Sequence, residues 1–384
     1  MFDNPFSPLM GGKPDSFFGR QELIGRFERA LDVRGSDDRA LFITGTRSLG
    51  KTTLVERLSQ KAAAAGWDTF DINAGNALNS LFRCLARFDT QSTTIAPQLS
   101  VSVLGSGGSI GGSGITQTSH YTVDDLDTLL LEVCAKANKG VFISIDEIQK
   151  VPLDDVSLIC CAFQMASRKG FDIALAVAGL PYAYNAVIQH DGCTFMRRCV
   201  HEELRLLTRG EVQGAFESTF DSVKGLRLDS DALQRLVAMS SGHPYMMQLL
   251  GYFVVEYANQ CAAERSYDVT LPDVEEVIPV ALAAYERRSL QPLLNEASRS
   301  EVGYLRAMAG VMGENHIAST NDVARAMGKS LSQVAPYRQS LIDSGIIIAT
   351  GHGTVRFAIP YLRGYMTKTS SDELAAQLID EWEV

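Results

Sequence analysis

Short apolar runs alternate with amphipathic stretches through the first half of this sequence. The runs are short enough for buried strands, whereas the stretches between them repeat apolar residues at helical spacing, as Leu23, Phe27 and Leu31 do. This alternation is typical of a parallel sheet covered by helices on both faces, so we predict an α/β fold. The predicted strands cover residues 41–44, 67–72, 141–145, 173–177 and 201–206, and the predicted helices cover residues 21–33, 52–65 and 123–137.

The pattern changes after about residue 207, where strand-like runs stop and helical spacing continues. A predicted linker near residues 289–298 leads to a last unit, in which three short helices precede two apolar strands. The turn Gly351-His352-Gly353 separates these strands and predicts a hairpin. The predicted helices of this half cover residues 209–220, 229–240, 244–258, 272–288, 299–312, 319–327 and 331–344.

These changes in pattern divide the chain into a core, a helical lid, a C-terminal domain and a tail. A stretch rich in glycine and serine interrupts the core, and we interpret it as an insertion. The predicted bounds are 1–207 for the core, 96–120 for the insertion, 208–290 for the lid, 296–366 for the C-terminal domain and 370–384 for the acidic tail.

The composition is that of an ordinary globular protein, with 46% hydrophobic and 21% charged residues and a formal net charge of −10. The negative charge argues against a generally basic nucleic-acid coat but allows a local basic patch. The seven cysteines include no Cys-x-x-Cys pair, which favours reduced thiols in a cytoplasmic protein over a disulfide framework or a zinc site. We see no secretory leader and no apolar run long enough for a membrane helix, so no membrane partner is expected.

Residues 45–52 carry the strongest chemical signal. They read Gly45-Thr46-Arg47-Ser48-Leu49-Gly50-Lys51-Thr52 and fit Gly-x-x-x-x-Gly-Lys-[Ser/Thr] between a predicted strand and a predicted helix. Glycines let the main chain wrap a phosphate with amide N–H groups pointing inward, and the helix N-terminus adds positive potential. We expect Lys51 to neutralise the β- and γ-phosphates of ATP and Thr52 to ligate Mg²⁺, with Thr53 also at the nucleotide. The flanking elements argue against the alternative of a chance Gly-Lys-Thr turn.

The apolar run at residues 141–145 ends in two acids, Asp146 and Glu147. Ligands of open α/β folds bind at the carboxyl edge of the sheet, so both acids are expected near the phosphates. Asp146 is predicted to hold Mg²⁺ through water, and Glu147 to orient and deprotonate the attacking water as a general base. An Asp-Glu pair at a strand end is a weak signal by itself, and its place downstream of the phosphate loop gives it weight.

These motifs resemble those of AAA+-type P-loop ATPases of the initiator and archaeal-ATPase branch, which borders the signal-transducing STAND ATPases. Phe18-Gly19-Arg20, Ala178-Gly179-Leu180-Pro181 and Gly242-His243-Pro244 belong to the same resemblance, which covers most of the chain and extends to bacterial ATP-binding proteins of similar length. The resemblance implies an α/β P-loop NTPase core with a parallel sheet, a helical lid and a C-terminal winged-helix domain. It also implies ATP and Mg²⁺ as ligands.

The resemblance further implies roles for residues outside the phosphate motifs. Gly19-Arg20 and His243-Pro244 would flank the adenine, although His243 could instead be a helix-start residue that packs locally. Arg197 and Arg198 precede the fifth strand, where such ATPases place an arginine that reaches a γ-phosphate, often that of a neighbouring subunit. The sequence does not choose between the two arginines, and a surface pair is the alternative. An arginine acting across subunits would imply a nucleotide-dependent homo-oligomer.

One departure from the family pattern concerns hydrolysis. AAA+ ATPases usually carry Asn, Ser or Thr after the fourth strand, whereas this sequence reads Ala176-Val177-Ala178-Gly179. Because that strand offers no polar side chain to the attacking water, we expect hydrolysis to be slow or to depend on a partner. A slow ATPase is best described as a nucleotide-controlled switch.

The C-terminal unit resembles a winged helix and is predicted to contact double-stranded DNA. Residues 296–368 contain eight lysines and arginines against five acids, a local charge of +3 in an acidic chain. The residues expected to reach bases or phosphates are Gln333, Tyr337 and Arg338 in the third helix, with His352 and Arg356 in the hairpin.

The sequence therefore leaves two functions open. The first is a DNA-associated ATPase switch, and the second is a signalling ATPase whose winged helix and acidic tail bind a protein partner, because winged helices also serve as protein-packing modules. A small-molecule kinase is less favoured, because it would need neither a water-activating Glu147 nor a C-terminal winged helix.

Overall fold

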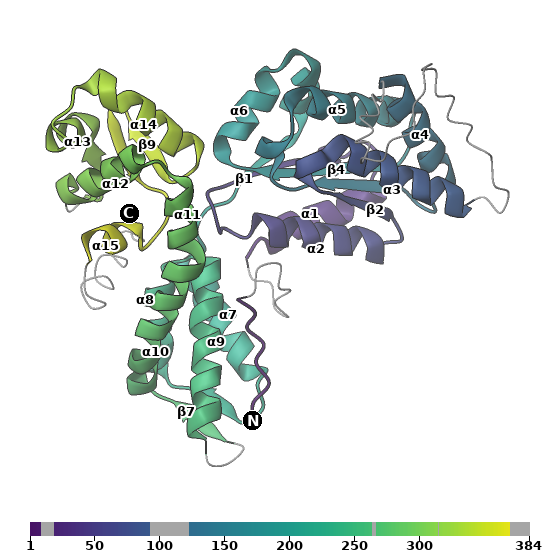
Figure 1. The fold of residues 1–384 in the computed structure, drawn as a ribbon. Helices are drawn as coiled ribbons and strands as arrows, with labels where there is room; N and C mark the ends of the chain where they lie inside the picture. The colour runs from purple at the N-terminus through teal and green to yellow at the C-terminus, as the bar shows by residue number, and fades with distance from the viewer. Residues whose placement is uncertain (9–18, 93–122, 263–265, 314, 369–384) are drawn as a thin grey trace, which may run out of the picture.

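The computed structural model describes residues 1–8, 19–92, 123–262, 266–313 and 315–368. Figure 1 shows a sheet covered by helices, a helical lid below it and a C-terminal domain beside it. Three predicted features lie outside the described residues: Phe18, the insertion at 96–120 and the acidic tail at 370–384. Across the described residues, no helix combines the length and the apolar character that crossing a membrane requires.

Five parallel strands form the central sheet in the order β2-β3-β4-β1-β5. Strand β4 therefore separates β1, which precedes the phosphate loop, from β3, which precedes Asp146. Strand β5 is shorter than the predicted 201–206, because its partner β1 ends at Thr44 and turns away into the phosphate loop. The strand bounds are β1 Ala40–Thr44, β2 Asp68–Ile72, β3 Val141–Ile145, β4 Ile173–Gly179 and β5 Val200–Glu203.

Two groups of helices cover the two faces of this sheet (Figure 1). The two faces of β4 differ in side-chain size. Its small residues belong to the core beneath α1 and α2, and these are Ala174, Ala176 and Ala178. The larger Leu175 and Val177 belong to the core on the opposite face. Small side chains under α2 let this helix, which starts at the phosphate loop, pack closely on the sheet. Helices α3, α5 and α6 have no counterpart among the predicted helices. The bounds are α1 Gln21–Asp32, α2 Lys51–Ala64, α3 Ala77–Ser92, α4 Val123–Lys136, α5 Leu153–Arg168 and α6 Pro181–Gln189.

The lid contains the four predicted helices and a short sheet that the sequence did not predict. Thr208 and Glu211 form a capping box at the start of α7, which fixes where this helix begins. Strands β6 and β7 pair in parallel between helices. The bounds are α7 Arg209–Asp221, β6 Leu226–Leu228, α8 Ser230–Ser240, α9 Pro244–Cys261, β7 Tyr267–Val269 and α10 Leu271–Tyr285.

The first residues of the chain pack on the lid, although the sequence division placed them with the core. The Phe6 ring lies 5.3 Å from that of Phe220, and the Asn4 side-chain amide donates to the Tyr252 carbonyl at 3.1 Å. The amide N–H of Phe2 donates to Asn259 Oδ1. The sequence signal was only a loop composition, so the tertiary partner of this segment could not be predicted from it.

In its described residues, the C-terminal domain contains helices α12 to α15 and a three-stranded antiparallel sheet in the order β8-β10-β9. In place of the linker predicted near 289–298, a π-helical turn and α11 continue from α10, because Leu290 and Leu293 are buried in a core shared with the lid. The bounds are π-turn Glu286–Leu290, α11 Gln291–Glu296, α12 Arg299–Val311, β8 Ala318–Ser319, α13 Thr320–Ala326, α14 Leu331–Asp343, β9 Ile347–Gly351, β10 Thr354–Phe357 and α15 Leu362–Thr367.

Candidate functional site

A cavity of about 570 Å³ opens where the carboxyl edge of the sheet meets the lid and the C-terminal domain. The phosphate loop and the first turn of α2 form one wall, with Glu147 beside them. The lid and α11 form the facing wall, and Ile359 of the C-terminal domain closes one side. Lining residues opposite the phosphate loop include Leu207, Pro244, Tyr245, Tyr285, Arg288 and Leu293.

Backbone geometry gives the phosphate loop its shape. Ser48 and Gly50 both have positive φ values, 63° and 84°, which turn the chain tightly before α2 begins at Lys51. Gly45 lies against the chain after β5, where an added Cβ would come within 3.2 Å of the Leu204 carbonyl oxygen. The loop therefore presents the N-terminus of a 14-residue helix to the cavity, which is a site that suits an anion.

Lys51 is a buried cation at the centre of this loop. Its ammonium donates to the Gly45 and Thr46 carbonyl oxygens at 2.9 and 2.8 Å, and the residue is only 6% exposed. Burial lowers the pKa of Lys51 to about 8, although the nearby carboxylates of Glu147 and Asp146 act in the opposite direction. These two bonds use two of the three ammonium donors, so the cation can still donate to a phosphate.

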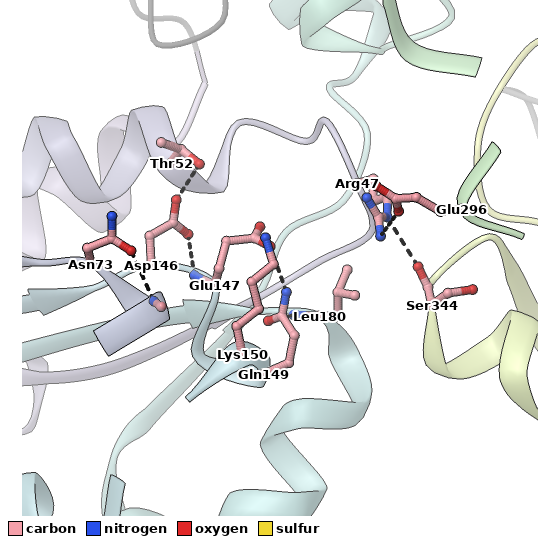
Figure 2. Close-up of polar contacts among 11 residues, drawn as sticks. Arg47, Thr52, Asn73, Asp146, Glu147, Gln149, Lys150, Leu180, Glu296 and Ser344 are labelled. Carbon is pink, nitrogen blue, oxygen red and sulfur yellow. Dashed lines mark hydrogen bonds and ion pairs between the residues drawn. The ribbon is translucent and has the colours of Figure 1, made fainter. Parts of the chain in front are cut away.

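Thr52, in the first turn of α2, and Asp146, directly after β3, come together at the carboxyl edge of the sheet. Thr52 Oγ1 donates to Asp146 Oδ2 at 2.5 Å, and Asp146 Oδ1 accepts from the Glu147 amide at 2.9 Å (Figure 2). Two hard oxygen ligands beside a phosphate site fit Mg²⁺, which takes few protein ligands and completes its shell with phosphate and water. No larger cluster of His, Cys, Asp or Glu that could hold a metal occurs in the described part of the chain.

Glu147 lines the cavity, and two residues of the turn that follows it contact its carboxylate. Its Oε2 atom accepts from Gln149 Nε2 at 2.9 Å and pairs with Lys150 Nζ at 3.1 Å (Figure 2). The backbone of Glu147 is left-handed, with φ 56°, so the chain turns sharply from β3 into the 3-10 turn Ile148–Lys150.

Two segments of the chain match known protein families. Residues 16–175 match the family described as AAA ATPase domain, and this segment contains the phosphate loop, Asp146 and Glu147. We call residues 16–175 the AAA ATPase domain, after the family that they match. Residues 288–366 match a family described as a domain of unknown function, which runs from the π-helical turn into α15. No curated protein matches the sequence significantly.

Two solved structures of one archaeal protein share the overall fold of this chain. The ORC2 protein of Aeropyrum pernix in its ADPNP-ADP complexes has 16% identity and a TM-score of 0.60, with 100% of this chain and 98% of that chain covered. Its ADP form has 15% identity and a TM-score of 0.53, with coverage of 97% and 99%. Cdc6p from Pyrobaculum aerophilum has 14% identity and a TM-score of 0.49, with coverage of 97% of both chains. The predicted α/β fold with a parallel sheet is confirmed.

Of the four residues expected to flank the adenine, two line the cavity and two do not. Arg20 and Pro244 line the cavity of the AAA ATPase domain, and Arg20 donates to the carbonyl of Arg205. Gly19 is buried, and an added Cβ would lie 2.6 Å from a methyl group of Leu207. His243 does not line the cavity: it is 1% exposed at the start of α9, and its ring meets Tyr285 edge-on at 5.9 Å. Burial lowers the pKa of His243 to about 4, so its ring is neutral in the lid core.

Arg197 and Arg198 do not reach the phosphate loop of their own chain. Both are exposed at the end of the 3-10 segment Asp191–Arg198, directly before β5. Strand β5 runs parallel to β1, so these arginines lie at the amino edge of the sheet, whereas the phosphates belong at the carboxyl edge. Arg197 Nε donates to the Ile188 carbonyl at 2.9 Å.

The five residues predicted to touch DNA have different environments. Gln333, His352 and Arg356 are exposed, and Arg338 is half-buried. The Tyr337 hydroxyl accepts from Lys329 Nζ at 3.2 Å, so this tyrosine is engaged within the domain. Arg356 lines a groove of about 930 Å³ between the C-terminal domain and the AAA ATPase domain, which also includes Arg205 and Arg209.

Arg47 connects the phosphate loop to the C-terminal domain, a contact that the sequence did not predict. Its Nε donates to the Ser344 carbonyl at 3.3 Å, and its Nη2 lies 3.5 Å from Glu296 Oε2 (Figure 2). Gln149, Tyr245 and Arg288 are further residues of the site that the sequence analysis did not select. Tyr245 directly follows Pro244, and Gln149 lies two positions after Glu147; that proximity was the only signal for them.

Proposed function

We propose that this protein binds ATP with Mg²⁺ and hydrolyses it slowly, using the cavity of the AAA ATPase domain. The observation that carries this proposal is the meeting of Lys51, the Thr52–Asp146 pair and Glu147 around one anion-binding helix N-terminus. The solved ORC2 protein complexes with ADPNP and ADP support an adenine nucleotide as the ligand of this fold.

Each residue has a defined task in the proposed reaction. Lys51 and the loop amides bind the β- and γ-phosphates. Thr52 and Asp146 would hold Mg²⁺, which neutralises phosphate charge when bound. Glu147 orients a water and accepts its proton as the water oxygen bonds to the γ-phosphorus. The bond between that phosphorus and the β-phosphate oxygen breaks, and ADP and phosphate leave.

The adenine end of the nucleotide would lie between the AAA ATPase domain and the lid. Pro244 and Tyr245 offer flat, mostly apolar surfaces there, and Leu207 and Leu293 add apolar contacts. Arg288 lines the same cavity from the π-helical turn and can approach a phosphate or the ribose. Because the lid and α11 share one core, a nucleotide that draws the lid closer also moves the C-terminal domain.

This coupling supports a nucleotide-controlled switch. Arg47 sits in the phosphate loop, and its bonds to Ser344 and Glu296 tie the loop to the C-terminal domain. A phosphate that enters the loop competes for this guanidinium and weakens those bonds. Leu180, at the end of β4, also packs beside Gly345 directly after Ser344, so the two domains touch at a second point.

We further propose that the C-terminal domain is a winged helix that contacts double-stranded DNA through the start of α14 and the β9–β10 hairpin. Exposed Gln333, His352 and Arg356 and half-buried Arg338 support this role, together with the local charge of +3. A protein partner is the alternative, and the internal bonding of other cations in this domain favours it. DNA titration of the full chain decides between the two.

The amino-edge position of Arg197 and Arg198 also supports action between subunits. From there, an arginine of one copy can reach only the phosphate of another copy, so we propose that ATP promotes self-association. Size measurement with and without a non-hydrolysable ATP analogue tests this, and Arg197→Ala and Arg198→Ala separate the two arginines. A chain that stays monomeric with the analogue would contradict it.

Substitution of Glu147 tests the hydrolysis proposal. Glu147→Gln keeps the shape of the side chain but cannot accept the proton, so phosphate release should fall about 100-fold while ATP affinity changes less than about threefold. The measurements are Mg²⁺-dependent phosphate release and nucleotide binding on the full chain. Hydrolysis at the wild-type rate in this variant would exclude Glu147 as the base.

A further inference from the structure

The carboxyl end of β4 carries no polar side chain that could contact the attacking water. Strand β4 lies between β1 and β3, so its carboxyl end stands between the phosphate loop and Glu147. Ala176 and Ala178 face the core under α2, and Val177 faces the opposite core. Any polar group at this position must therefore come from another segment.

Gln149 extends its side chain into this position. Its Nε2 atom donates to Glu147 Oε2 at 2.9 Å, and its Oε1 atom accepts from the Leu180 amide at 3.2 Å, directly after β4 (Figure 2). The Leu180 N–H can only donate and the carboxylate can only accept, so both ends of the amide are oriented. The amide bridges the general base and the end of the strand.

The lack of a side chain at Gly179 is what makes room for this bridge. An added Cβ on Gly179 would lie 2.8 Å from Gln149 Oε1 and 2.6 Å from Ile148 Cγ2. Both distances are shorter than real Cβ contacts, so even alanine would displace the turn that carries Gln149. The glycine, the glutamine and the carboxylate thus form one packed unit.

We propose that Gln149 is the positioning residue of Glu147 and supplies the polar group that β4 lacks. This inference rests on the proposed hydrolysis of ATP. Gln149 and Lys150 both contact Oε2 of the carboxylate, so we assign acceptance of the water proton to Oε1. The second N–H of the amide can donate to the attacking water or to the γ-phosphate. Lys150 contributes less, because its side chain is 65% exposed and its ion pair is screened by solvent.

The test is a double-mutant cycle that joins Gln149→Met and Glu147→Gln. Methionine keeps the length of the side chain without its hydrogen bonds, so kcat for ATP hydrolysis should fall about 10- to 30-fold with ATP affinity within about twofold of wild type. In the Glu147→Gln background the same substitution should cost less than about twofold, because the proton acceptor is already lost. Gly179→Ala should reproduce the loss of kcat without removing any polar atom. Gln189→Met, at an exposed position of α6, is the matched control and should leave kcat unchanged.

Three results would overturn the inference. One is a Gln149→Met variant with wild-type kcat, and another is an equal loss in both backgrounds. A parallel fall in ATP affinity would mean that Gln149 only supports the fold of the site. If the wild-type chain releases no more phosphate than Lys51→Ala, the proposed hydrolysis itself fails, and this inference fails with it. If the wild type is active and Gln149→Met equals it, only the inference fails.

Discussion

The phosphate site and the C-terminal domain use their polar residues in opposite ways. At the phosphate site, Lys51, Thr52 and Glu147 line one cavity, and Asp146 accepts a hydrogen bond from Thr52. In the C-terminal domain, cations bond to partners within the domain, as Arg325 does to Asp322 at 3.0 Å and Arg363 to the Met312 carbonyl at 2.9 Å. A compact ligand needs convergent groups, whereas much of the charge in the second region maintains its own fold.

This difference predicts how strongly single substitutions act. A cation buried at a ligand site has been desolvated in advance, so its removal costs the full interaction with the ligand charge. Exposed ion pairs contribute only about 0–1 kcal/mol each, because water and salt screen them. Effects on ATP binding should therefore concentrate in one residue, and effects on a DNA contact should be shared among several.

The largest effect is expected from Lys51→Ala. Loss of the buried ammonium should weaken ATP binding about 100-fold or more, measured by titration of the full chain with a labelled nucleotide. Lys61→Ala is the matched control in the same helix: Lys61 pairs with Glu28 at 2.8 Å on the surface and should leave the affinity unchanged. Equal losses in both variants would mean that the helix, and not the lysine, is what the nucleotide needs.

A smaller effect, on the pH dependence of stability, is expected from His243, which is buried in the lid. Its pKa is about 4 in the folded chain against 6.5 when exposed, so only the unfolded chain takes up this proton between those pH values. Stability should therefore be unaffected near pH 7 and fall as the pH drops below 6.5, by about 3 kcal/mol at pH 4.

Urea unfolding at pH 7 and pH 4.5 measures this loss. His243→Met removes the titrating ring, so the difference in unfolding free energy between the two pH values should shrink by about 2 kcal/mol. His352→Met, at the exposed hairpin turn, should keep the wild-type difference. An unchanged pH difference in His243→Met would show that the ring is protonated equally in both states.

The smallest effects should follow substitution of the arginines proposed to touch DNA. Arg338→Ala and Arg356→Ala should each weaken duplex binding several-fold and lower the salt dependence by about one unit of slope. Arg325→Ala is the control, because this arginine is paired with Asp322. Fluorescence anisotropy at low and moderate salt is the measurement. No binding at micromolar protein in either salt would leave the protein-partner role as the better explanation.

The sequence alone located the candidate site residues that lie in contiguous segments. The phosphate loop and the Asp146–Glu147 pair could be read directly, because the backbone turn and the strand end that position them are encoded in adjacent residues. Residues that act through distant contacts could not be found in this way. The Arg47–Ser344 bond spans 297 positions, and the Gln149–Leu180 bond depends on β4 lying next to β3.

The sequence by itself determined the α/β order of elements, the phosphate loop and the acids that face it, because apolar periodicity and local turn chemistry suffice for these. Only the tertiary structure decided that Gln149 joins Glu147 to the end of β4, that Arg197 and Arg198 lie at the opposite edge of the sheet from the phosphate loop, and that α11 shares a core with the lid. These outcomes depend on strand order and on shared burial, which bring together residues that no local pattern connects.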